Sequence, residues 1–145
     1  MIKLLWSDFM DTTRSELRKK IMTILYQINV YESNKVSFDV NEIIKSVLEI
    51  DNEFVKDIVY GVITYKDNID KLANKYLNKW TIDRLGNTDQ AIIRMSIYEL
   101  MYTDTPDVVV INEAIELAKL YSDDKVKNMI NGILDKIYHE KVLHE

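Results

Sequence analysis

A short run of basic residues near the start of the chain is the first feature that could bind a ligand: Arg14, Arg18, Lys19 and Lys20. Arg14 and Arg18 are four residues apart, so a helix would place them on one face. Clustered lysines and arginines bind phosphates through charge-assisted hydrogen bonds. The competing interpretation is an ordinary solvated helix face, because short charge clusters are common. Glu16 lies within the run and weakens its positive field.

A pair of carboxylates in the second half of the chain is the next candidate. Glu113 and Glu116 have helical i, i+3 spacing, but no histidine lies near them in the sequence to complete a metal site. The chain has no cysteine, which excludes thiolate metal sites, disulfides and cysteine nucleophiles. Glycine-rich phosphate loops, nucleophile elbows and HExxH motifs are also missing. We therefore expect no catalytic residue, no metal site and no cofactor.

The bulk composition favours a single all-α domain. The chain has 145 residues, of which 47% are hydrophobic and 30% charged, which suits one folded core. Only 3 glycines and 1 proline are present, and long helices need few turn residues. The formal net charge of −5 disfavours general nucleic-acid binding. Any RNA role must depend on a local basic patch or on a partner protein.

Apolar stripes at helical spacing, separated by short polar breaks, predict a series of helices. Expected N-terminal signals are a capping box at Thr13 and Glu16, Asp39, a start near Asp51, Thr88 or Asp89, and Thr105 followed by Pro106. Whether the stripe from residue 51 to residue 77 is one kinked helix or two stays open. A short apolar segment with Trp80, Ile82 and Leu85 ends at Gly86.

The two ends of the chain and one internal glycine carry separate expectations. Residues 1–12 are predicted to be a flexible N-terminal arm or an upstream extension, and residues 13–145 a single helical domain. The apolar run in residues 1–10 is too short and too interrupted for a signal peptide or a membrane span. Residues 139–145 read as a frayed tail. Gly132 predicts a close helix crossing, where a Cβ atom would clash.

Four blocks in the second half of the chain resemble the family of the bacterial transcription antitermination factor NusB. They are WTIDRL (80–85), DQAIIRMSIYEL (89–100), Pro106 with VINEAIELAKLY (110–121), and NGILDK (131–136). The blocks occur in the family's order and at its spacing. Arg14, Arg18, Leu25 and Tyr26 fit the family's basic first helix more loosely, so the resemblance covers roughly residues 14–136.

The resemblance implies a fold of about seven helices in two packed bundles. It also implies a non-enzymatic cytoplasmic adaptor, with no membrane role, that pairs with NusE, a small-subunit ribosomal protein. Together the two proteins would bind the boxA element of nascent RNA, including that of rRNA operons. They would then join the antitermination complex on RNA polymerase.

The resemblance assigns two sets of residues. The RNA-binding set is Arg14, Arg18, Lys19, Lys20, Tyr26, Lys125, Lys127, Asn128 and Met129. The protein-partner set is Asp89, Arg94, Glu113 and Glu116, although internal ion pairs are the favoured interpretation for Asp89 and Arg94. Tyr26 has the alternative of packing in the core. Ser15 and Glu16 stand where family members often carry arginine, and Met129 replaces an aromatic residue, so we expect weak RNA binding by this chain alone.

Two alternative functions compete with the adaptor interpretation. Ribosomal-RNA cytosine methyltransferases carry a similar domain ahead of a catalytic one, but their catalytic part needs cysteine nucleophiles. The other alternative is a helical interaction module that binds a protein partner, or itself as a homodimer, and has lost RNA binding. The thin basic cluster and the acidic balance of the chain keep this second alternative open.

Overall fold

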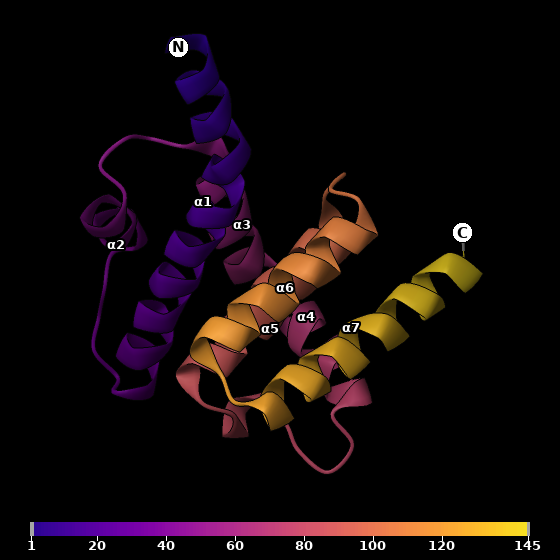
Figure 1. The fold of residues 1–145 in the computed structure, drawn as a ribbon. Coiled ribbons are helices and arrows are strands. Elements are labelled where there is room, and N and C mark those ends of the chain that lie inside the picture. The colour runs from indigo at the N-terminus through magenta and orange to yellow at the C-terminus, as the bar shows by residue number, and fades with distance from the viewer. Residues whose placement is uncertain (1, 145) are drawn as a thin grey trace.

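The structure is a computed structural model that describes the backbone of residues 2–144 and the side chains of residues 14–144 (Figure 1). Over this range the chain forms seven α-helices, one short 3-10 helix and no strand, which confirms the all-α prediction. The elements are α1 (Ile2–Ser33), α2 (Val40–Val47), α3 (Glu53–Thr64), α4 (Lys66–Tyr76), η1 (Ile82–Arg84), α5 (Asn87–Tyr102), α6 (Asp107–Tyr121) and α7 (Asp124–Leu143).

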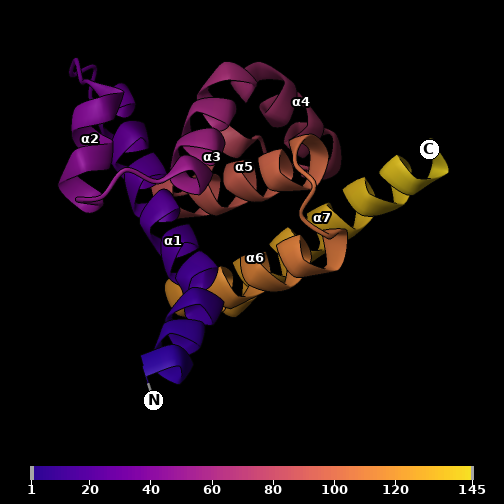
Figure 2. The ribbon, with the colours of Figure 1, turned by 90° about the horizontal axis from the view of Figure 1, so that it is seen from above.

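Helix α5 lies at the centre of the molecule and joins two groups of helices. On one side α1 packs against α2 and α3, and on the other α4, α6 and α7 surround α5 (Figures 1 and 2). Every residue of α5 from Gln90 to Leu100 is buried. Apolar residues occur on all sides of this helix, which is the pattern of a helix enclosed by the core. The prediction of two packed bundles is confirmed.

Several helix ends follow the local capping chemistry expected of them. The Asp39 carboxylate accepts a hydrogen bond from the backbone N–H of Glu42 at 3.2 Å and begins α2, as predicted. Asn52 and Asp123 cap α3 and α7 in the same way. The apolar stripe from residue 51 to residue 77 forms two helices rather than one kinked helix, because the chain breaks at Tyr65 between α3 and α4.

Three predicted helix starts are wrong. Helix α1 continues back to Ile2, so Thr13 does not begin it. Helix α5 begins at Asn87 with Gly86, which has no side chain, at the cap position, so Thr88 and Asp89 lie within its first turn. The Asp89 carboxylate accepts a hydrogen bond from Ser122 at 2.5 Å. Helix α6 begins one residue later than expected, since Pro106 takes the cap position. Neighbouring residues at these helix ends carry equally plausible start signals, and the sequence alone does not say which of them begins the helix.

The predicted frayed tail is also wrong, because α7 remains helical to Leu143. Glu140 accepts hydrogen bonds from Lys75, at 2.7 Å, and from Tyr76. Lys141 donates to Asp107 and to the backbone carbonyl of Leu100, both at 3.0 Å. These contacts hold the last turns of α7 against α4, α5 and α6.

The tight helix contact predicted at Gly132 occurs at Gly61 instead. A Cβ atom built on Gly132 meets no heavy atom within 4 Å outside its own helix and chain neighbours. A Cβ atom on Gly61 would lie 2.1 Å from ring atoms of Tyr98. Glycine at position 61 therefore lets α3 lie directly against the Tyr98 ring of α5.

The prediction of a flexible arm or upstream extension at residues 1–12 stays a prediction. The backbone is helical from Ile2, and the side chains of residues 1–13 lie outside the described residues. Among the described helices, none combines the length and the apolar character needed to cross a bilayer.

Candidate nucleic-acid interface

Arg18, the centre of the predicted basic face, is buried within the protein. Its guanidinium donates to both carboxylate oxygens of Glu99 on α5, at 3.0 and 2.5 Å. Glu113 on α6 lies 3.9 Å from the same group. Only 3% of Arg18 is exposed, so its planar bidentate contact with Glu99 ties α1 to α5. The expectation that Arg18 offers its charge to RNA is therefore corrected: the structure gives this arginine an internal role.

Arg14 is exposed but faces acidic neighbours. Its guanidinium carbon lies 4.6 Å from the centre of the Phe54 ring, a cation–π arrangement that directs the side chain toward α3. Together with Glu53, Asp57 and Asp104 it lines an open recess. These three carboxylates oppose the approach of a phosphate. Arg14 and Arg18 share a face as predicted, since both guanidiniums lie over Phe54, yet that face is not an open basic surface.

Lys19 and Lys20 are the remaining cations of the α1 cluster, and both are partly exposed. The Glu16 carboxylate accepts a hydrogen bond from Lys19 at 3.0 Å, and this bond, followed by the Glu16 charge, raises the lysine pKa above its ordinary value. Lys19 thus stays cationic, but Glu16 competes with any phosphate for its charge. Tyr121, at the end of α6, lies close enough to influence the same pKa. On α1, Ser15 donates a hydrogen bond to Glu113 of α6 at 2.8 Å, so the α1 cluster lies beside α6.

Tyr26 presents an aromatic ring on the exposed side of α1. It follows Lys19 by seven residues, so the two side chains lie on one helical face. The ring is 41% exposed, which removes it from the core and leaves it open to stacking.

The predicted contacts at the start of α7 are mostly accessible. Lys125 and Asn128 are exposed, while Lys127 is partly buried and lies 3.7 Å from Asp124. Met129 packs against the core with part of its side chain open. This turn contributes accessible positive charge at the start of α7.

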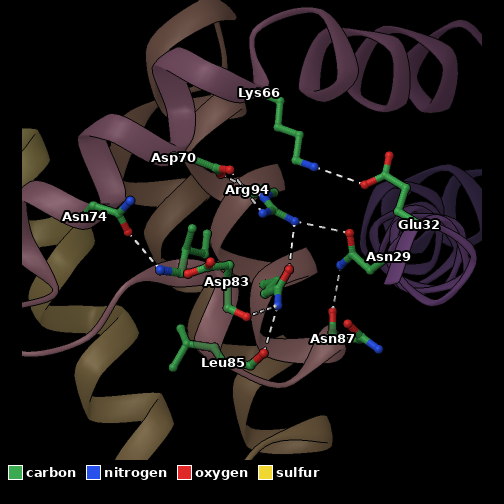
Figure 3. Close-up of polar contacts among 11 residues, drawn as sticks. Asn29, Glu32, Lys66, Asp70, Asn74, Asp83, Leu85, Asn87 and Arg94 are labelled. Atoms are coloured by element: carbon green, nitrogen blue, oxygen red, sulfur yellow. Dashed lines mark hydrogen bonds and ion pairs between the residues drawn. The ribbon is translucent and has the colours of Figure 1, made fainter. Parts of the chain in front are cut away.

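The predicted protein-partner residue Arg94 is internal. Its guanidinium donates to both oxygens of Asp70, at 2.8 and 3.1 Å, and also to Asn29 and Gln90 (Figure 3). In Figure 3 these side chains converge from α1, α4 and α5, and Lys66 reaches Glu32 above them. The expectation of a partner contact at Arg94 gives way to the favoured alternative, an internal ion pair that joins the two bundles.

The other three predicted partner residues remain at the surface. Asp89 is half-buried and bonded to Ser122. Glu113 accepts a hydrogen bond from Ser15 at 2.8 Å, and Glu116 pairs with Lys119 on the outer side of α6. Glu113 and Glu116 share an accessible face of α6, whereas Asp89 lies at the start of α5. No metal centre competes for these carboxylates: within the described residues no group of three or more potential ligands is arranged to hold an ion.

Sequence reasoning missed a second basic surface beside α7. Trp80 was assigned to a short apolar segment, but its side chain is 54% exposed. With Lys79 and Lys136 it lines a groove that also includes Lys125 and Met129. The polar neighbours Asn78 and Lys79, directly before Trp80, are the signal in the sequence that indicates a surface tryptophan.

The fold and these surfaces define a class of protein: a two-bundle helical binding protein whose described surface offers cations and aromatic rings. The family model described as NusB family matches residues 15–139, most of the chain. The chain belongs to the NusB family, as the sequence blocks indicated.

Individual relatives agree with this assignment over nearly their whole length. The transcription antitermination protein NusB of Campylobacter jejuni is 37% identical over 131 residues, which are 89% of this chain and 98% of the relative. A solved structure of NusB from T. maritima is similar with a TM-score of 0.75 and 32% identity, covering 88% of this chain and 91% of that one. A structure of the antitermination factors NusB and NusE in complex with dsRNA contains a similar chain, with a TM-score of 0.73 and 26% identity over 88% of this chain and 96% of that chain.

Proposed function

We propose that the protein is a transcription antitermination adaptor that binds boxA-type RNA of nascent transcripts, including those of rRNA operons. It does so together with the ribosomal protein NusE and joins RNA polymerase in the cytoplasm. The role has no catalytic step and needs no cofactor. The observation that carries the proposal is the similarity, over almost the whole of both chains, to a protein solved in complex with NusE and dsRNA.

The RNA surface that supports this proposal is narrower than the sequence suggested. The surface comprises Lys19, Lys20 and Tyr26 on α1 and Lys125 and Lys127 at the start of α7, all of them exposed or partly exposed. Arg18 supports the surface from within by fixing α1 against α5. Because few cations are free, NusE must supply part of the affinity for RNA.

The partner surface that supports it is the accessible part of the predicted set. Glu113, Glu116 and Asp89 offer carboxylates at or near the surface, which suit a basic ribosomal protein. Such charges increase the rate of association more than the final affinity.

A second candidate function, an interaction module without RNA binding, is favoured by one observation. Of the two arginines that the resemblance assigns to RNA, Arg18 is buried against Glu99, and the exposed Arg14 stacks over Phe54. In that case the protein would bind NusE, or a second copy of itself, with no dependence on RNA.

Purified protein, purified NusE and a labelled boxA RNA separate the two candidates in an anisotropy titration. The adaptor predicts tight ternary assembly that weakens about tenfold or more when Lys19→Glu and Lys20→Glu are combined, because phosphate contacts become repulsive. Lys45→Glu on α2 is the matched control, since Lys45 is exposed and distant in the chain from both RNA segments. Assembly with NusE that ignores RNA would favour the interaction module. Arg18→Glu is not a suitable probe, because it would place a second carboxylate against the buried Glu99.

A further inference from the structure

A groove between the end of α4 and the first half of α7 combines features that the α1 cluster lacks. It has a volume of about 380 Å³, within the range of roughly 300–1,000 Å³ typical of small-ligand sites. The α4 side contributes Lys79 and Trp80. The α7 side contributes Lys125, Gly132 and Lys136. Helices α4 and α7 contact each other and lie close together in Figure 1.

The charge of the groove is opposite to that of the protein. Lys79, Lys125 and Lys136 are all exposed, and within the described part of the chain none of them forms an ion pair. No carboxylate is among the residues that line the groove. Glu140 touches Tyr76 at one end, but Lys75 matches its charge at 2.7 Å. A chain of net charge −5 thus keeps three unpaired cations around one hollow, a site complementary to an anion.

Trp80 gives the groove a flat aromatic surface on an anchored stretch of backbone. The chain turns at Asn78, which adopts a left-handed conformation with φ of 58°, and the Trp80 N–H then donates to the Leu77 carbonyl at 3.1 Å. Two residues later Ile82 is buried, and its N–H donates to the Asn74 side chain at 2.8 Å. The backbone on both sides of Trp80 is therefore anchored, while 54% of the residue stays exposed. An exposed ring of this kind suits stacking.

Gly132 keeps the α7 wall of the groove open. Glycine within a helix is unfavourable by about 1 kcal/mol relative to alanine. No contact explains its presence, since a Cβ atom there would meet nothing within 4 Å. The missing side chain leaves room in the groove, which Gly132 and Trp80 both line.

We propose that this groove binds a nucleotide of single-stranded RNA, with the base stacked on Trp80 and the adjoining phosphates held by Lys79, Lys125 and Lys136. The proposal rests on the proposed function and extends its RNA path, because Lys125 and Met129 belong both to the groove and to the start of α7. A nucleotide carries a flat ring and an anion together, as the groove requires. An acidic peptide supplies only the anion, so it fits the lysines and leaves Trp80 unexplained.

Trp80 fluorescence tests the contact directly. The chain has two tryptophans, so Trp6→Phe leaves Trp80 as the sole reporter. Titrating the complex of this variant and NusE with unlabelled boxA RNA should quench the remaining emission and reach saturation. Trp80→Ala should weaken RNA binding by about 5-fold to 100-fold, the range for losing one stacked base, while Trp80→Phe should retain most of the affinity.

The lysines and the glycine give independent readouts on the same complex. Lys79→Ala combined with Lys136→Ala should reduce the slope of log affinity against log salt by about 0.7 for each phosphate that the lysines no longer neutralise. Lys45→Ala, matched in type and exposure, should leave the slope unchanged. Gly132→Leu should fill the hollow and reduce affinity, with circular dichroism and the NusE affinity reporting that the fold is intact.

The outcomes separate this proposal from the proposed function. If RNA still binds, and is weakened by Lys19→Glu with Lys20→Glu, but the groove variants and the Trp80 emission do not respond, the groove does not bind RNA and the adaptor role stands. If the groove variants lose NusE in the absence of RNA, the groove is a protein-binding surface and the proposal is wrong. If no RNA binds at all, both proposals are wrong.

Discussion

The α1 cluster and the groove beside α7 contain similar numbers of cationic side chains and differ in what surrounds them. On α1, Arg18 is held by Glu99, Arg14 lies over Phe54 among carboxylates, and Lys19 bonds to Glu16. In the groove, Lys79 and Lys136 have no such partners within the described residues. Basic residues that look alike in sequence therefore divide into those that stabilise the fold and those left available to a ligand.

The largest expected effect tests the internal role of Arg18. Arg18→Ala leaves Glu99 buried without a partner, and losing one member of a buried pair costs about 3–5 kcal/mol of folding stability. Urea denaturation measures this as a lower midpoint. Arg14→Ala is the control on the same helix and should shift the midpoint little, because Arg14 is exposed. Equal shifts for the two variants would contradict the internal role of Arg18.

The next effect compares the clusters as RNA ligands. Lys79→Glu combined with Lys136→Glu should weaken boxA RNA binding in the NusE complex about tenfold or more, equal to roughly 1.4 kcal/mol. Arg14→Glu should change it less than about twofold, since Arg14 already lies among three carboxylates and contributes little positive potential. Anisotropy with labelled RNA measures both, and the reverse ranking would mean that Arg14, rather than the groove, contacts RNA.

Gly132→Ala extends the comparison to the folding stability of the groove wall. Replacing a helical glycine that has open space around it should stabilise the fold by about 0.5–1 kcal/mol. Gly61→Ala is the opposite case, because its Cβ would overlap the Tyr98 ring. Thermal or urea unfolding should move in opposite directions for the two variants. A destabilising Gly132→Ala would mean that the fold itself requires glycine there.

The smallest effect concerns Lys19. Because Glu16 already holds its ammonium group, Lys19→Ala should lower the salt dependence of RNA binding by less than the value of about 0.7 expected for one full phosphate contact. Glu16→Gln should restore the full contribution by freeing the lysine. Anisotropy titrations at several salt concentrations measure the slopes. If Lys19→Ala alone lowered the slope by the full value of about 0.7, Glu16 would not be competing with phosphate for the lysine.

Much of the fold could be predicted from local sequence, because periodic apolar stripes and caps such as Asp39 act over a few residues. The misjudged boundaries depend on distant partners. The last turns of α7 are held by the hydrogen bond from Lys75 to Glu140, and the Asp89 side chain accepts a hydrogen bond from Ser122. Such pairings lie outside any short window of sequence.

The candidate interface was harder to predict for the same reason. Arg18 and Glu99 are separated by 81 positions in the chain, so nothing near Arg18 shows that its charge is matched. Trp80 begins a short apolar segment with Ile82 and Leu85, and the polar residues Asn78 and Lys79 before it are the only local sign that its side chain is exposed. The blocks that resemble the family lie in the correct part of the chain, but only the structure shows which of their side chains are accessible to a ligand.

The burial of α5 on all sides has a consequence for how the molecule comes apart. This helix packs against α1, α3, α4, α6 and α7, so neither group of helices retains a complete core when the other opens. Unfolding should accordingly be a single cooperative transition, and the amide protons of α5 should exchange with solvent only when the entire chain opens. A shortened version that stops before α7 would expose apolar side chains of α5 and α6 to water, so it would not keep the function of the whole chain.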